Sequence, residues 1–321
     1  MNNAQTHYGS LLGFFLFAFS ALFLFIMAFF LAVSLLPAYV NTGKIATPTV
    51  IYSFSTAFLG VLVSIAAVIV LLRFLNNPLA DAPVSTAFPA WQIAAAILGG
   101  GLALLVGYSF QNNEAVNWLI LPLLTIPAVM LPLWTIVGLG IRGISLGPRW
   151  RTWGVLGISL TLTPFVLVVI EIVMIIGIIV LVFLYAGTQP DLVAEFKRLG
   201  TQFMFLDVET EAGAEEILKL ITPFLMKPVV FIPMLVMFSL LIPLVEELIK
   251  PLVVWFFARR LDSPAQGFAF GALSGAGFAM WETFNVSGQM AEWGSILFSR
   301  IGTGLLHITT SGLMGMAIYL A

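Results

Sequence analysis

Long apolar runs, separated by short polar segments, make up most of the chain. Eight of these runs come close to the about 20 residues that an α-helix needs to cross the hydrocarbon core of a bilayer. The pattern therefore predicts an all-α fold, a polytopic membrane helical bundle with about eight transmembrane helices. The predicted spans cover residues 11–36, 50–72, 91–109, 118–141, 156–185, 229–257, 267–286 and 296–320.

The composition supports this prediction and excludes several kinds of protein. Hydrophobic residues make up 60% of the 321 residues, charged residues make up 9%, and the mean hydropathy is +1.08, whereas soluble chains are about 25% charged. Cysteine is absent, which excludes disulfides, thiolate metal sites and a cysteine nucleophile. The net charge of −2, without a basic cluster, gives no sign of a nucleic-acid partner. Because the chain ends at Ala321 directly after an apolar run, we expect the native protein to continue beyond it.

Arginine residues follow the even-numbered spans, whereas the loops after spans three and seven contain neither lysine nor arginine. The loop after span one carries only Lys44. The positive-inside rule therefore predicts that the even-numbered loops and the N-terminus are cytoplasmic. The arginines concerned are Arg73, Arg142, Arg149, Arg151, Arg259 and Arg260.

One long polar segment, residues 186–227, separates spans five and six and is expected outside the membrane. Apolar residues recur in it at helical spacing, as at Leu192 and Phe196. We expect short amphipathic helices there, which form either a solvated surface segment or a cap that gates substrate. The chain then divides into an N-terminal accessory bundle of four spans, 1–150, and a catalytic membrane core, 151–321, that includes this extracytoplasmic loop.

The sixth run contains three ionisable side chains in a stretch that is otherwise apolar: Glu246, Glu247 and Lys250. Each costs roughly 2.5–3.5 kcal/mol at the centre of a bilayer, so such groups persist where they pair, face protein or function. On a helix Lys250 reaches either carboxylate, at spacings of four and three residues. Burial and like charge then favour one carboxylate as a general base near neutral pH. Pro243 and Pro251 flank the acids, which predicts a kinked or locally unwound helix.

The last two runs carry further polar side chains. Glu282 and Asn285 lie in the seventh run, and His307 and Ser311 lie in the eighth. Arg300 precedes His307 by two helical turns, so both lie on nearly the same helix face. Three consecutive spans thus offer an acid pair with a lysine, an acid with an amide, and an imidazole with a hydroxyl.

Glycine recurs at every fourth position of the seventh run, at Gly267, Gly271 and Gly275. Such a stripe lets the backbone of a neighbouring helix approach without intervening side chains. We expect this contact to hold Glu282 in register against span six or span eight.

This ordered set of polar residues resembles the PrsW family of intramembrane proteases and, more distantly, the CAAX-prenyl protease and bacteriocin-processing group. The family pattern is EExxK, then FxxxE, then a histidine, and the resemblance covers about residues 241–315. Two positions depart from it: Thr283 stands where the family often has asparagine, and Ser311 stands where it has an acid. The matching residues are Glu246, Glu247, Lys250, Phe278, Glu282 and His307.

The resemblance implies an intramembrane endopeptidase in a prokaryotic plasma membrane, with single-span or membrane-anchored proteins such as anti-sigma factors as substrates. In such an enzyme Glu246 or Glu247 would activate water as general base, and the spacing does not separate the two. His307 would donate to the oxyanion or to the leaving group. Glu282 and Asn285 would orient water or substrate. Packing is the expected role of the phenylalanine in the second motif.

A metal-dependent version of the same chemistry is equally compatible with the sequence. Glu247, or its neighbour Glu246, together with Glu282 and His307 would supply two oxygens and one nitrogen to zinc or another divalent metal. The metal would bring the pKa of a bound water towards about 7. Against this version, the chain has no HExxH motif and a single intramembrane histidine. Both mechanisms stay open at this point.

Two other classes of function compete with a protease. Intramembrane acids, a lysine and a histidine also form the proton relays of proton-coupled transporters. Inverted repeats would favour a transporter, but the charged spans cluster in the last third of the chain. A non-catalytic membrane scaffold is the third class, and it has no reason to tolerate so many unfavourable groups in hydrocarbon.

Overall fold

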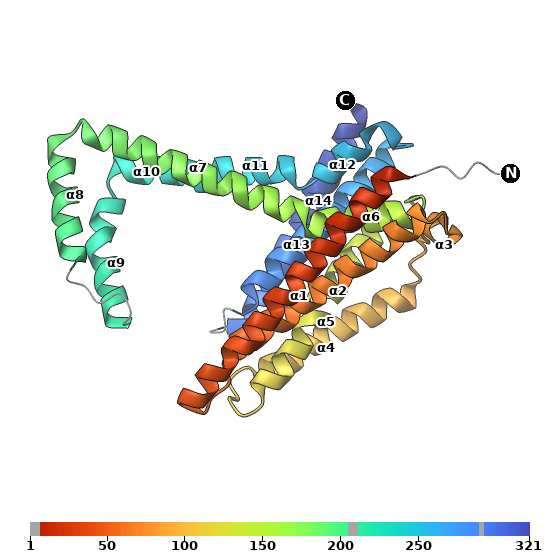
Figure 1. Cartoon of the computed structure of the whole chain (residues 1–321), viewed down its shortest axis with the longest axis horizontal. Helices are drawn as coiled ribbons and strands as arrows, with labels where there is room; N and C mark the ends of the chain where they lie inside the picture. Colours follow the sequence, from red (N-terminus) through yellow and green to blue (C-terminus); the bar gives the residue numbers. More distant parts are fainter. Residues whose placement is uncertain (1–6, 205–210, 289–291) are drawn as a thin grey trace. The chain divides into compact units, whose positions relative to one another are not determined.

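The computed structural model describes residues 7–204, 211–288 and 292–321. Within these ranges the chain is helical almost throughout and contains no β-strand, which confirms the all-α prediction (Figure 1). The chain forms two compact units: the first comprises Met1–Phe165 with Glu247–Ala321, and the second is Val166–Glu246. These units group the residues by contact, whereas the predicted division at residue 150 concerns function and stays a prediction.

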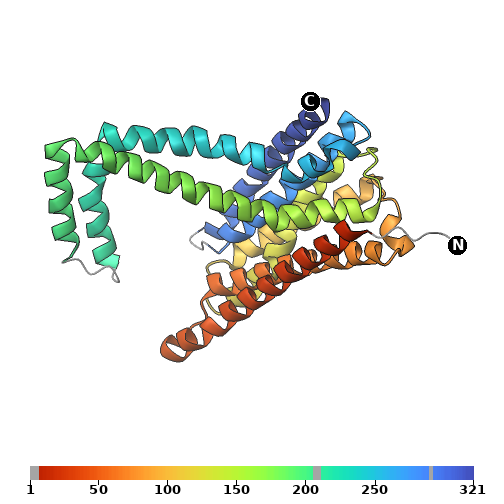
Figure 2. The same ribbon diagram turned by 45° about the horizontal axis from the view of Figure 1, so that its top comes forward.

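The first unit is a helical bundle built from both ends of the chain. In it, helices from the N-terminal part of the chain, residues 8–160, pack against helices from the C-terminal part, residues 252–320 (Figures 1 and 2). Its helices are α1 (Tyr8–Thr42), α2 (Thr47–Phe74), α3 (Pro78–Asp81), α4 (Ala90–Phe110), α5 (Asn117–Gly140), α6 (Arg149–Leu160), α12 (Leu252–Phe257), the 3₁₀ turn η2 (Ala258–Arg260), α13 (Pro264–Val286) and α14 (Trp293–Leu320).

Helix α13 occupies the centre of the first unit. It packs along α14 and also contacts α2, α5, α6 and α12. Sixteen of its 23 residues are buried. Because other helices cover it, α13 needs small residues for close packing more than large apolar ones for contact with lipid. This explains why glycine and alanine fill so much of its sequence.

All eight predicted spans are helical in the structure. Across the described residues, seven helical stretches are long and apolar enough to cross a membrane. The predicted seventh span, now α13, is not among these seven, since its glycine-rich and alanine-rich sequence is less apolar. At about 1.5 Å per residue its 23 residues still extend roughly 35 Å, which exceeds a hydrocarbon core of about 30 Å. The protein is an integral membrane protein.

Proline and its neighbours interrupt two of the predicted spans. The fifth is broken at Thr161, where α6 ends and α7 (Leu162–Gly187) begins, three residues before Pro164. The sixth is interrupted at Lys250 and Pro251, between α11 (Ile242–Ile249) and α12. Proline has no N–H and cannot bond the carbonyl four residues earlier, so the helical ladder opens at this point. The predicted kink in the sixth span is therefore confirmed.

The predicted alternation of loops is visible at the two ends of the first unit. At one end Arg149 N donates to Ala82 O over 2.9 Å, and Arg151 Nη1 donates to Arg260 O over 3.3 Å. These contacts bring the loops after spans two, four and six together at one end, which we name the arginine end. Its assignment to the cytoplasm, and the cytoplasmic N-terminus, stay predictions from the positive-inside rule.

The opposite end joins the loops after spans one and three. There Lys44 Nζ lies 2.8 Å from Glu114 Oε2, with both side chains exposed. The hydrogen bond between them, helped by their opposite charges, raises the pKa of Lys44 and lowers the pKa of Glu114. Both groups therefore stay charged at neutral pH.

The second unit contains the predicted amphipathic helices. Residues 205–210 of the long segment lie outside the described residues. Phe196 contacts both Phe183 and Phe224, so an aromatic cluster joins three helices of this unit. A role of this segment as a substrate cap stays a prediction. The elements are α7, α8 (Pro190–Phe203), α9 (Glu211–Leu225), α10 (Pro228–Val236), the π-helical segment η1 (Met237–Leu241) and most of α11.

Candidate active site

The helix break at Lys250 is held by two buried serines that sequence reasoning missed. Ser274 Oγ, on α13, donates a hydrogen bond to the carbonyl oxygen of Lys250. Ser159 Oγ, on α6, lies 2.8 Å from Ser274 Oγ. Ser159 Oγ also lies 2.7 Å from the carbonyl oxygen of Val155, so each serine hydroxyl has a carbonyl acceptor and either one can be the donor between the two. The signal in the sequence is weak, because small hydroxyl residues are common wherever membrane helices pack closely.

We expect Ser274→Ala to destabilise the first unit, because it leaves the buried carbonyl of Lys250 without this donor. An unsatisfied buried polar group costs about 1–3 kcal/mol. Thermal unfolding of the detergent-purified protein should show a clear fall in Tm. Ser299→Ala is a matched control, because Ser299 is exposed and bonds only within its own helix. Equal Tm values for the two variants would contradict this role of Ser274.

The ammonium group of Lys250 is the centre of the intramembrane polar cluster. Its side chain is 1% exposed. Nζ lies 2.8 Å from Glu247 Oε1 and 2.9 Å from His307 Nδ1, and 4.8 Å above the ring of Phe278. The predicted pairing of lysine with an acid three residues earlier is present. Phe278 packs against both groups: its ring lies over the ammonium of Lys250 in a cation–π contact and stands at 90° to the ring of His307.

His307 bridges Lys250 and Glu282, and its partners define its tautomer. Nε2 lies 2.9 Å from Glu282 Oε2, and an ionised carboxylate only accepts, so Nε2 carries a proton. Nδ1 faces the ammonium of Lys250, which only donates, so Nδ1 accepts. These two contacts together assign a neutral imidazole with its proton on Nε2.

Arg300 completes the cluster from the same helix as His307. Its Nη2 forms an ion pair with Glu282 Oε2, the oxygen that also faces His307. The cluster is thus a chain of contacts from Glu247 through Lys250, His307 and Glu282 to Arg300. With a neutral imidazole, two acids balance two cations, which limits the cost of burying the charges.

The two carboxylate oxygens of Glu247 differ in their hydrogen bonding. Oε1 is bonded to Lys250, but Oε2 is buried and has no hydrogen-bond partner among the residues that the structure describes. The side chain as a whole is 29% exposed. A buried acceptor of this kind suits a hydrogen-bond donor from outside the protein, such as a water or a substrate N–H.

Two predicted site residues, Asn285 and Ser311, make no contact with the cluster among the described residues. Asn285 is exposed and donates to the carbonyl of Trp281 on its own helix, over 2.8 Å. Ser311 is fully buried, and its hydroxyl has no partner within the described part of the chain.

The glycine stripe of α13 fixes the cluster in register, as predicted, and its partner is α14. A Cβ placed on Gly275 would lie 2.2 Å from the carbonyl oxygen of His307. A Cβ on Gly271 would lie 2.0 Å from that of Ser311. These contacts are between backbones, so the two helices cannot separate without moving His307 away from Glu282.

The fold and the cluster define an integral membrane protein with a polar site between its spanning helices. Residues 217–321 match the model of a family described as PrsW family intramembrane metalloprotease. No curated protein and no solved structure matches the chain. The matched third of the chain contains every residue of the cluster. This region therefore matches the family that its motifs resemble, which supports a membrane protease in general.

The arrangement of the site residues does not fit the metal that the family description implies. The structure contains, in its described ranges, no group of three acidic, histidine or cysteine side chains that could hold a metal ion. His307 turns Nε2 to Glu282, while Glu247 Oε1 lies 3.9 Å from the other ring nitrogen. The two carboxylates thus face different ring nitrogens of His307, so a metal ion bound to one nitrogen could be ligated by only one of the carboxylates. The ammonium of Lys250 occupies the remaining nitrogen and would repel a cation.

Proposed function

We propose that this protein is an intramembrane endopeptidase in which Glu247 activates the attacking water. The observation that carries the proposal is the unequal environment of its two carboxylate oxygens. Lys250 holds Oε1 and compensates the negative charge, whereas Oε2 is buried and has no partner among the described residues. A carboxylate oriented on one side and open on the other is what a general base needs.

The reaction follows from these positions. Glu247 Oε2 takes a proton from water while the water oxygen bonds to the carbonyl carbon of the scissile peptide. The negative charge then gathers on the carbonyl oxygen. The protonated Glu247 gives its proton to the amide nitrogen, the C–N bond breaks, and an acid and an amine leave.

Arg300 is the donor that we assign to the developing negative charge, because the single proton of His307 is already bonded to Glu282. Arg300 Nε is buried and makes no hydrogen bond within the described ranges, so it is available to a carbonyl oxygen. Glu282 orients both side chains, through Nη2 of Arg300 and Nε2 of His307. Donors that are oriented before the reaction stabilise an oxyanion without reorganisation during it.

The depth of the site points to a substrate in the membrane. His307 lies midway along α14, 14 residues after Trp293, which corresponds to about 21 Å of helix. The hydrocarbon core is about 30 Å thick. A single-span or membrane-anchored protein places a peptide bond at this depth, whereas a soluble peptide does not. We therefore propose membrane-anchored proteins as the substrate class.

The proposed function can be tested without knowing the substrate in advance. Membranes from cells that produce the protein, or its Glu247→Gln variant, are compared by mass spectrometry for new protein N-termini. We expect new termini within or next to transmembrane segments in the active sample alone. Identical termini in both samples would contradict the proposal. Proton flux into proteoliposomes that depends on Glu247 would favour a transporter instead.

We expect cleavage to persist when divalent metals are removed, because the arrangement of the site fits none. Once a substrate is found, the purified protein is dialysed against EDTA and 1,10-phenanthroline, and the cleavage rate is measured. An unchanged rate supports the mechanism based on Glu247. Loss of cleavage, with recovery on adding zinc, would contradict it and support a metal-dependent protease.

A further inference from the structure

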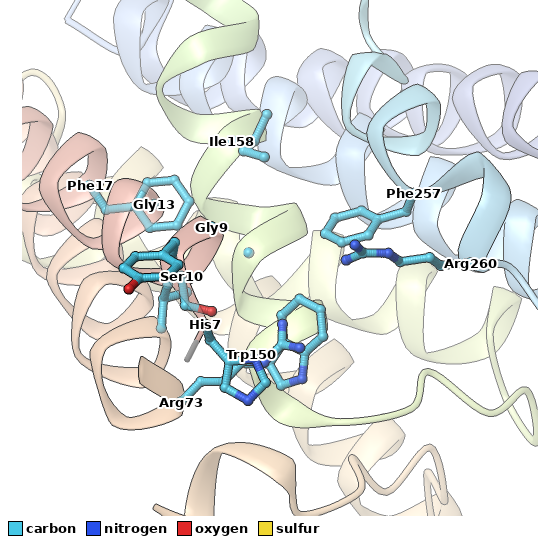
Figure 3. A pocket seen from close by; sticks show the side chains of 13 residues that line it. His7, Gly9, Ser10, Gly13, Phe17, Arg73, Trp150, Ile158, Phe257 and Arg260 are labelled. Carbon is cyan, nitrogen blue, oxygen red and sulfur yellow. The ribbon is translucent and has the colours of Figure 1, made fainter. Parts of the chain in front are cut away.

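A cavity of about 490 Å³ lies at the arginine end of the first unit, away from the catalytic cluster. The start of α1, the end of α2, α6 and the segment from α12 to η2 line it (Figure 3). Arg73, Arg260 and Trp150 form part of its wall, and Phe17, Ile158 and Phe257 form apolar parts of it. None of these residues belongs to the proposed catalytic machinery.

The cavity gathers positive charge that the protein does not neutralise. Among the described residues, no carboxylate is within ion-pair distance of Arg73, Arg151 or Arg260. Asp81 attracts Arg73 electrostatically without forming an ion pair with it. Arg73 lies with Cζ 3.2 Å above the centre of the ring of Trp150. Three neighbouring guanidinium groups repel one another unless an anion lies between them.

The arginine side chains also have donors to spare. Nε of Arg73 and Nε of Arg151 are buried and have no hydrogen-bond partner within the described ranges. Arg151 uses one Nη atom on the carbonyl oxygen of Arg260, which ties α6 to η2. A planar guanidinium with unused donors matches a phosphate group, whose oxygens accept in pairs.

The apolar part of the cavity wall favours a phospholipid over a free phosphate. Phe17, Ile158 and Phe257 offer hydrocarbon surface to the same cavity that Arg73 and Arg260 line. A free phosphate has nothing to place against these side chains, whereas a phospholipid has acyl chains. Basic pockets between transmembrane helices at the cytoplasmic side bind anionic lipid headgroups. Trp150 is also the type of residue that is enriched at the membrane–water interface.

We propose that this cavity binds the phosphate of an anionic phospholipid, with Arg73 and Arg260 on the phosphate oxygens and an acyl chain along Phe17 and Ile158. The lipid would join α1, α2, α6 and the α12–η2 segment. Because that segment follows the helix break at Lys250, the lipid would also fix the part of the chain next to the catalytic cluster.

The test uses the full-length protein in detergent after removal of bound lipid. Phosphatidylglycerol or phosphatidylcholine is added, and binding is followed by native mass spectrometry and by Tm. We expect phosphatidylglycerol to bind more tightly and to raise Tm more. The double variant Arg73→Gln with Arg260→Gln should weaken phosphatidylglycerol binding by about tenfold or more. Arg149→Gln, which removes an exposed arginine from the same end outside the cavity, should change little.

A second variant keeps the arginines and fills the cavity instead. Gly154 lines the cavity, and a Cβ there would have nothing within 4 Å, so Gly154→Leu adds bulk without a clash at Cβ. We expect it to remove the preference for phosphatidylglycerol while the protein stays folded. In a third experiment, inorganic phosphate replaces the lipid, and Tm is measured. If phosphate raises Tm as much as phosphatidylglycerol, the lipid assignment is wrong. Equal binding of the two lipids, or an equal effect of Arg149→Gln, would overturn the site.

Discussion

Glu247→Gln is expected to abolish cleavage while the protein still inserts and folds. Glutamine has the same shape and keeps a carbonyl oxygen for Lys250, but it cannot take a proton from water. Loss of a general base costs typically about 10²–10⁴-fold in rate. Cleavage is measured on purified wild type and variant in proteoliposomes at equal protein, with Tm measured in parallel.

The matched control for this variant is Glu114→Gln. It makes the same chemical change at an exposed carboxylate at the end of the bundle opposite the arginines. We expect this control to cleave at the wild-type rate. If Glu247→Gln also cleaves at the wild-type rate, Glu247 is not the base. A loss confined to Glu246→Gln would then move that role to the neighbouring carboxylate.

Gly275→Ala is expected to lower both stability and activity. The added Cβ would lie 2.2 Å from the carbonyl oxygen of His307 and 3.0 Å from the Cα of Ile308. Both atoms belong to the backbone of α14, so relief requires the two helices to move apart. Overpacking of this kind costs typically about 1–3 kcal/mol. A displacement of His307 by about 1 Å can cost roughly 10²-fold in rate.

The control for this contact is Gly302→Ala, which changes another glycine of α14. A Cβ on Gly302 would have nothing within 4 Å, so the substitution meets open space and gains helix propensity. Its Tm should equal or exceed that of the wild type, and its cleavage rate should be unchanged. Thermal unfolding and cleavage are measured for both variants. Equal Tm values would show that α13 and α14 are not in backbone contact at this position.

The sequence by itself determined the membrane helices and which of them carry intramembrane polar side chains. Apolar runs of this length become helices because hydrocarbon offers no hydrogen bonds, so the backbone must satisfy its own groups. The pair of Glu247 and Lys250 followed from helical spacing, and the break at Lys250 followed from Pro251. The small-residue stripe of α13 predicted its close contact with another helix. Each of these features depends on residues that are near one another in the chain.

Only the tertiary structure decided which groups from different helices meet. Arg300 reaches Glu282, and His307 bridges Glu282 and Lys250, whereas Asn285 points away although it lies three residues from Glu282. These outcomes depend on the rotation and height of whole helices, which side-chain packing across their interfaces determines. The tautomer of His307 depends on partners from two other helices. The arginine end likewise combines residues far apart in sequence, and its cavity exists because four segments surround it.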